Sequence, residues 1–162
     1  MRELIKIENA EIRFHENWPD IDVNLVMLVL DLGRTSTKFN NQVELVCKTC
    51  DISVFELEVL VLLRSFPYPH RLTPSWLSKS LMVSSGGLTK VLIKLENKGY
   101  ITRDQNPTDK RSRIVRLTDE GISFIEKNYP YVENIAKHFF QSKLNKKELL
   151  QLNSLLIKLL KN

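Results

Sequence analysis

Residues 72–121 read LTPSWLSKSLMVSSGGLTKVLIKLENKGYITRDQNPTDKRSRIVRLTDEG and decide the fold of this chain. From residue 72 to residue 116 this stretch holds nine basic and three acidic side chains, a net charge of +6, whereas the whole chain carries +5. Positive charge gathered on one segment is typical of a surface that contacts phosphate groups. The sequence therefore predicts a polyanion as partner.

Two short helices are predicted at the start of this stretch. Thr73 and Pro74 begin the first, because threonine caps free backbone N–H groups and proline is tolerated in a first helical turn. This helix is expected to end near Ser80, and only residues 81–83 separate it from the next helix. Two helices joined by so tight a turn form a helix-turn-helix unit, whose second helix enters the major groove of DNA.

The second helix is expected to be capped by Ser84 or Ser85 and to run to Lys98, with Gly99 as its C-cap. Leucines at helical spacing predict the side that faces the core. They are Leu88, Leu92 and Leu95.

A β-hairpin is predicted over residues 100–103 and 113–117, separated by the polar loop DQNPTDKRS. Val115 and Leu117 fall on one face of the second strand, so the hairpin is expected to be half-buried. A hairpin that follows a helix-turn-helix unit forms a wing. The sequence thus predicts a mainly α fold with a small β-hairpin wing.

Further helices are predicted before this unit. Residues 20–46 carry an apolar-rich pattern without an internal proline, which predicts one long first helix weakened at Gly33. Ser53 and Glu56 form a capping box for the next helix, which is expected to stop before Pro67.

Helices are also predicted after the hairpin. Thr118 begins one that is expected to be interrupted or kinked at Pro130, and Asn145 with Glu148 begins the last. An apolar last helix has to bury its leucines, either within one subunit or, as we favour, in a dimer. The leucine seam consists of Leu149, Leu152, Leu156 and Leu159.

Composition limits the class of protein. The apolar-rich run over residues 21–32 is shorter than the ~20 residues that span a bilayer, and the amino terminus lacks the pattern of a signal peptide. We therefore expect a cytoplasmic protein without a membrane partner. The histidines at positions 15, 70 and 138 stand apart from any nucleophile motif or carboxylate pair, so we expect neither an enzyme nor a cofactor or metal.

Several motifs of the stretch resemble, in order and spacing, the MarR family of bacterial transcriptional regulators. The resemblance implies a homodimer whose two winged lobes bind a pseudo-palindromic site in double-stranded DNA. It also implies three regions: a dimerisation helix region over residues 1–50, a winged helix-turn-helix domain over 51–118, and dimerisation helices over 119–162. The motifs are LTP, SSGGLT, LIKLENKG, ITR, DKRS and LTDEG.

The resemblance also assigns DNA-contacting residues. Hydroxyl and amine side chains of the second helix would bond base edges and phosphates, although its serines would serve equally as caps. Arg111 matches the arginine that family members insert into the minor groove, and Asp109 would orient it; the alternative is a solvated loop. The expected contacts are Thr73, Ser75, Ser84, Ser85, Thr89, Lys90, Lys94, Arg103, Asp109, Lys110, Arg111 and Arg113.

Family members are commonly repressors released by small aromatic molecules. In the urate-responsive branch a tryptophan, an acidic residue and an arginine shape the ligand pocket, and Trp18 and Glu56 fit the first two positions. Val91 takes the place of the arginine, which argues against urate and leaves a different small aromatic effector open. The alternative for Trp18 is a packing residue.

Cysteine oxidation is the second release route in the family. Cys47 and Cys50 form a C-x-x-C at the end of the predicted first helix. Inert thiols, a redox switch and half of a metal site shared between subunits all stay open. A winged helix used as a protein-interaction module is the alternative to DNA binding.

Overall fold

A computed structural model of the chain describes residues 7–105 and 113–161, with side chains described from residue 12 onward. Asp109, Lys110 and Arg111, predicted to contact DNA, lie outside the described residues. The described chain forms two compact units, Met1–Asn40 and Asn41–Asn162, whose boundary falls within one long helix.

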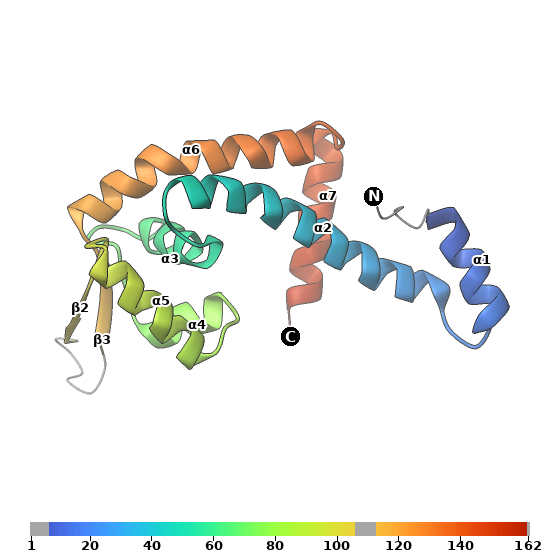
Figure 1. Ribbon diagram of the computed structural model, residues 1–162, viewed down its shortest axis with the longest axis horizontal. Helices are drawn as coiled ribbons and strands as arrows, with labels where there is room; N and C mark the ends of the chain where they lie inside the picture. Colours follow the sequence, from blue (N-terminus) through green and yellow to red (C-terminus); the bar gives the residue numbers. More distant parts are fainter. Residues whose placement is uncertain (1–6, 106–112, 162) are drawn as a thin grey trace. The chain divides into compact units, whose positions relative to one another are not determined.

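The first unit contains α1 (Ile7–Asn17) and most of α2 (Val23–Thr49) (Figure 1). The prediction of a single helix over residues 20–46 was wrong at both ends. Asp22 begins α2, because its Oδ1 accepts hydrogen bonds from the backbone N–H groups of Asn24 (3.0 Å) and Leu25 (3.2 Å). Helix α2 runs through Gly33, where a single glycine costs a long helix only about 1 kcal/mol.

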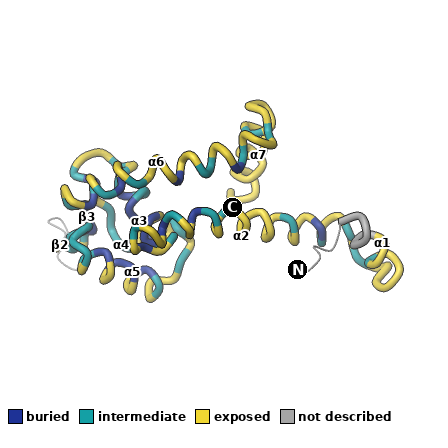
Figure 2. Tube along the Cα trace, turned by 45° about the horizontal axis from the view of Figure 1, so that its top comes forward, coloured by how far each residue is buried: buried dark blue, intermediate teal, exposed yellow. Residues whose placement is uncertain are grey.

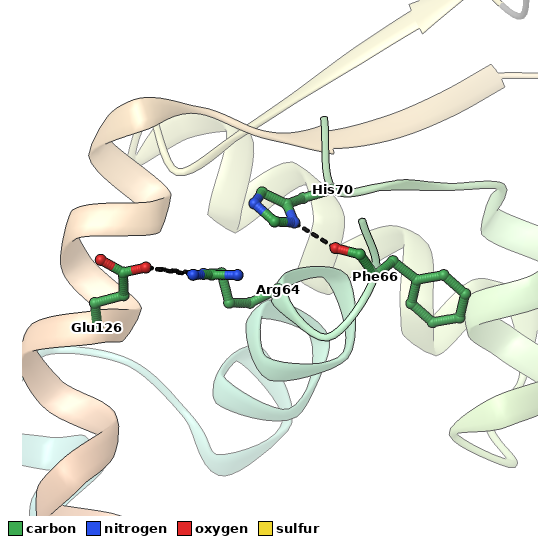
Figure 3. Close-up of polar contacts among 4 residues, drawn as sticks. All are labelled: Arg64, Phe66, His70 and Glu126. Atoms are coloured by element: carbon green, nitrogen blue, oxygen red, sulfur yellow. Dashed lines mark hydrogen bonds and ion pairs between the residues drawn. The ribbon is translucent and has the colours of Figure 1, made fainter. Parts of the chain in front are cut away.

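The second unit is built around α3 (Val54–Arg64), and its capping box is confirmed. The Glu56 N–H donates to Ser53 Oγ at 3.1 Å, and the Ser53 N–H donates to Glu56 Oε2 at 2.6 Å. Helix α6 (Asp119–Gln141) packs against α3, and Arg64 binds Glu126 Oε1 through Nη2 at 2.6 Å and Nε at 3.0 Å (Figure 3).

The helix-turn-helix unit consists of α4 (Pro74–Ser80) and α5 (Ser85–Asn97). The predicted caps are confirmed: Thr73 Oγ1 accepts from the Trp76 N–H at 3.2 Å, and Ser84, not Ser85, caps α5. The Ser78 hydroxyl donates to the Val83 carbonyl at 2.6 Å and so ties the turn to α4.

The wing belongs to an antiparallel sheet in the order β1-β3-β2, where β1 is Arg71–Leu72, β2 is Ile101–Gln105 and β3 is Arg113–Leu117. Both hairpin strands were predicted, and the fold class is confirmed. Strand β1 was not predicted, because two residues carry no alternation to detect. It pairs with β3 at Arg71↔Arg116 and Leu72↔Val115.

His70 fixes the segment that leads into β1. This residue is only 7% exposed, and its Nδ1–H donates to the Phe66 carbonyl at 2.5 Å (Figure 3). Its own carbonyl accepts from the Leu117 N–H at 3.2 Å, which extends the sheet by one hydrogen bond.

The core of this unit lies between α3, α4, α5 and the sheet. Its members are fully buried leucines and β-strand residues that alternate inward. They include Leu60, Leu63, Leu77, Leu88, Leu95, Ile101 and Val115.

The last two helices differ in burial (Figure 2). Helix α6 continues through Pro130, so of the predicted interruption or kink the interruption was wrong, while the predicted Thr118 cap is confirmed. The capping box of Asn145 and Glu148 is confirmed for α7 (Lys146–Leu160), a helix with no buried residue. Within the described ranges, no helix is both long and apolar enough to cross a bilayer.

Candidate DNA-binding surface

Helix α5 has one buried and one exposed side. Leu88, Val91, Leu92 and Leu95 point into the core. Successive residues turn by about 100° around a helix, so the opposite side is centred on Gly86, Lys90, Ile93 and Asn97. All four are on or near the exposed face in the structure, and Ile93 is 43% exposed.

The two flanks of α5 carry different chemistry. Ser85, Thr89 and Glu96 share the flank nearer the wing, while Lys94 and Lys98 share the other flank. The Thr89 hydroxyl donates to the Ser85 carbonyl at 2.7 Å, which leaves its oxygen free to accept.

Among the described residues, Lys90 and Lys94 make no ion pair, and both are exposed. A cation without a carboxylate partner keeps its full charge for phosphate. The predicted residues Ser85, Thr89 and Lys90 therefore lie together on a surface that a duplex can reach.

The start of α4 supplies a second group of predicted contacts. Thr73 is half-buried and occupied as a cap, whereas Ser75 is exposed. Trp76, the next residue of α4, is 40% exposed. Its ring meets Phe66 edge to face, with centroids 4.8 Å apart, so only part of it is buried.

The base of the wing carries two predicted arginines in different environments. Arg113 is exposed, and its Nη1 lies 3.5 Å from the Arg103 carbonyl. Arg103 is half-buried and gives two N–H groups to Glu96 on α5: Nε at 2.7 Å and a shorter contact from Nη2. Sequence reasoning missed this pair, because Glu96 and Arg103 belong to different predicted elements.

An open cleft of about 800 Å³ adjoins the Lys94 flank of α5. The end of α2 supplies Glu44 and Lys48, the start of α3 supplies Glu56, and α5 supplies Lys94 together with Lys98 just beyond its end. Lys98 is held by Asp51, 3.4 Å from its Oδ2.

Glu56 is the chemically unusual member of the cleft. It is 3% exposed, and its Oε2 serves the capping box. Its Oε1 is buried without a hydrogen-bond partner among the described residues. Leaving a buried acceptor unpaired costs about 1–3 kcal/mol, so a donor at this position would be stabilising.

Trp18, the other predicted ligand residue, belongs to the first unit. It is 59% exposed and lines a shallow pocket with Arg13, Phe14 and Asn17.

The cysteines lie where α2 ends. Cys47 is 1% exposed, and burial raises the pKa of its thiol, with Cys50 and Glu44 adding to the effect. Cys50 is half-buried, and its Sγ–H donates to Asn128 Oδ1 at 3.2 Å. A buried thiol that resists ionisation is a poor nucleophile. In the described part of the chain no group of three or more His, Cys, Asp or Glu side chains could hold a metal ion.

The chain is similar to known transcriptional regulators. The family model described as the MarR family matches residues 52–112. PecS, an HTH-type transcriptional regulator of Dickeya dadantii (strain 3937), is 28% identical over 127 residues, covering 78% of this chain and 76% of PecS. A crystal structure of an E. coli MarR mutant complexed with operator DNA is 28% identical, has a TM-score of 0.75, and covers 87% of this chain and 100% of that one.

Over residues 52–112 the chain matches the MarR family. BpsR of Bordetella bronchiseptica shares the fold at a TM-score of 0.74 and 20% identity, over 83% of this chain and 99% of BpsR. The match to this family model confirms the resemblance predicted from the motifs.

Proposed function

We propose that this MarR-family chain is a homodimeric repressor that binds a pseudo-palindromic operator. The observation that carries the proposal is the outer face of α5, where Ser85, Thr89 and Lys90 are exposed together and the lysine has no ion pair among the described residues. Exposed hydroxyls and amines at the start of a helix suit base edges and phosphates in the major groove.

The wing supplies the second contact in this proposal. Arg113 is exposed at the base of the hairpin, and Lys110 and Arg111 stay contacts predicted from the sequence. An arginine in a narrow minor groove is stabilised by the negative potential there. The start of α4, with Ser75 exposed, would meet the phosphate backbone beside the groove.

Unburied apolar side chains support the homodimer. On α7, Leu159 is 74% exposed and Leu155 is 52% exposed, and on α2, Val29 is 69% exposed. Soluble monomers rarely expose so many large apolar side chains in contiguous patches. A second copy of the chain is the partner that the family resemblance implies, with one lobe for each half-site.

The cleft beside α5 is the proposed effector site. It combines the unpaired Glu56 Oε1, which needs a hydrogen-bond donor, with the ammonium groups of Lys94 and Lys98. A small aromatic molecule that carries both a donor and an acidic group fits this combination. Because Lys94 lies on α5 and Lys98 directly follows it, a bound molecule would act on the helix that reads DNA.

Binding to a labelled duplex over a range of salt concentrations tests the proposal. Each phosphate neutralised contributes about −0.9 to the slope of log K against log salt, so several contacts give a steep slope. Weak binding with a shallow slope would favour a protein-interaction module instead.

The effector site needs a separate test. 6-Hydroxynicotinic acid, which regulates DNA binding by BpsR, supplies a first effector probe. If the cleft is the site, Glu56→Gln should alter the effect of this molecule on DNA binding.

Oxidation of Cys47 and Cys50 is the alternative release mechanism. The burial and raised pKa of Cys47 favour an inert thiol there. Release of DNA by mild peroxide, lost in a Cys50→Ser variant, would restore the redox alternative.

A further inference from the structure

Glu96 is the only acidic residue of α5, whose sequence is SGGLTKVLIKLEN. It lies on the wing-side flank of the helix, with Ser85 and Thr89. A carboxylate on a helix that enters the major groove repels phosphates, and it therefore needs a structural reason to be there.

The reason is its contact with Arg103. Two N–H groups of the guanidinium, Nε and Nη2, converge on Glu96 Oε2. The side chains are 23% and 35% exposed for Arg103 and Glu96, so the pair is largely shielded from solvent. A guanidinium that gives two donors to one carboxylate fixes direction as well as distance.

Strand register shows what the pair connects. Arg103 lies in the middle of β2, opposite Val115 of β3, and Val115 is fully buried. Ile101, two residues earlier and therefore on the same face of the strand, is 1% exposed. Arg103 thus lies on the same face of β2 as the buried Ile101, at the edge of the core, where its side chain contacts Glu96 near the end of α5.

From this point the hairpin projects toward the wing loop. Beyond Arg103, β2 continues for only Asp104 and Gln105, paired with Ile114 and Arg113. The contact at Arg103 therefore sets the direction in which the two strands of the hairpin leave the core. On the helix side, the same contact holds the end of α5.

We propose that Arg103 is a positioning residue, which Glu96 holds so that the wing and the recognition helix meet one duplex together. This inference rests on the proposed function of DNA binding through α5 and the wing. It replaces the role of Arg103 as a phosphate contact, because the donors of its guanidinium that face α5 are engaged by Glu96.

The two roles predict effects of opposite sign for Glu96→Gln. If Arg103 contacts phosphate and Glu96 is a bystander, removing a negative charge from this surface tightens binding. If Glu96 positions the wing through Arg103, the same substitution weakens binding, although the surface has become more positive.

The experiment measures anisotropy of a labelled duplex carrying the protein's selected site, across a range of salt concentrations. We expect Glu96→Gln and Arg103→Gln each to weaken binding roughly tenfold and to change the salt slope by the same amount, since both act through the placement of the wing and neither side chain contacts phosphate itself. The exchange Glu96→Arg with Arg103→Glu should recover most of the affinity. Arg113→Gln is the matched control and should lower the slope by about one.

Thermal unfolding identifies variants that fail to fold. Arg103→Lys keeps the charge without the two-donor geometry, and we expect its loss of affinity for the duplex to be intermediate. Glu96→Gln binding as tightly as the wild type, or a slope lowered by about one in Arg103→Gln but not in Glu96→Gln, would overturn the inference. A wild-type protein that binds no duplex overturns the proposed function itself, which distinguishes the two failures.

Discussion

Gly121 shows how closely α6 approaches the wing. A Cβ atom at this position would lie 2.1 Å from the Tyr100 carbonyl oxygen and 3.2 Å from Leu117 Cδ2. The carbonyl is not free to move, because it accepts from the Thr118 N–H at 3.1 Å. The glycine of the LTDEG motif is thus required by packing.

Gly121→Ala should therefore lower the free energy of unfolding by about 1–3 kcal/mol, the usual cost of overpacking. Gly86→Ala is the control, since a Cβ at Gly86 meets no atom within 4 Å and alanine favours a helix. Urea unfolding of both variants measures the difference. Equal stability of the wild type and Gly121→Ala would show that α6 can move away from Tyr100.

Cys47 makes stability depend on pH. Burial raises the pKa of its thiol, so the folded chain keeps this proton at pH values where the unfolded chain has released it. An unfolded thiol ionises near pH ~8.5. The free energy of unfolding should be unaffected well below that pH and should fall above it, by at most about 1.4 kcal/mol per pH unit.

Urea unfolding between neutral and alkaline pH measures this slope. The free energy of unfolding of Cys47→Ala should fall less steeply with rising pH than that of the wild type, whatever the stability of the variant at neutral pH. Cys50→Ala should keep most of the fall. Parallel curves for the wild type and Cys47→Ala would contradict the assignment.

At the level of elements, local signals predicted the DNA-reading half of the molecule. Caps such as Thr73, Ser84 and Thr118 are read directly from the sequence because each satisfies backbone groups a few residues away. Strand β1 and the contact between Glu96 and Arg103 depend on which segments meet in space. A pattern of neighbouring residues does not indicate which distant segments will pack together.

The amino-terminal helices were predicted less well for a related reason. Helix α1 (Ile7–Asn17) is mostly polar, so its periodicity is weak, and the Asp22 cap that begins α2 lies inside the apolar-rich run. Of the candidate site, the exposed face of α5 follows from helical periodicity alone, and a helical projection would also have shown Ile93 on it. The unpaired Oε1 of Glu56 required the packed structure.

Helix α5 allows a direct test of one phosphate contact. Lys90 is exposed near the centre of the outer face, so Lys90→Gln should weaken binding to all duplexes alike and reduce the salt slope by about one. Lys127→Gln, on exposed α6 surface, is the control and should change neither quantity. A slope that is unchanged in Lys90→Gln would place this lysine outside the interface.

At the scale of the whole molecule, α7 is the helix that we propose as part of the homodimer interface. Leu156 and Leu159 lie near the centre of its apolar side, and they are 36% and 74% exposed in the single chain. Leu156→Lys combined with Leu159→Lys should therefore convert a dimer to monomers while leaving the winged helix-turn-helix fold intact.

Sedimentation equilibrium measures the change in mass. Ser154→Lys adds the same kind of charge on the polar side of α7 and should leave the dimer intact. A double variant that sediments like the wild type would show that α7 buries its leucines within one chain.

The central claim is that two copies of this chain read one inverted-repeat site in DNA. Selection of bound sequences from a random duplex pool tests it most directly. The account predicts enrichment of a pseudo-palindrome whose half-sites are centred about 10 bp apart, or a multiple of one helical turn. Recovery of a pool without any enriched repeat, from protein shown to be folded, would contradict it.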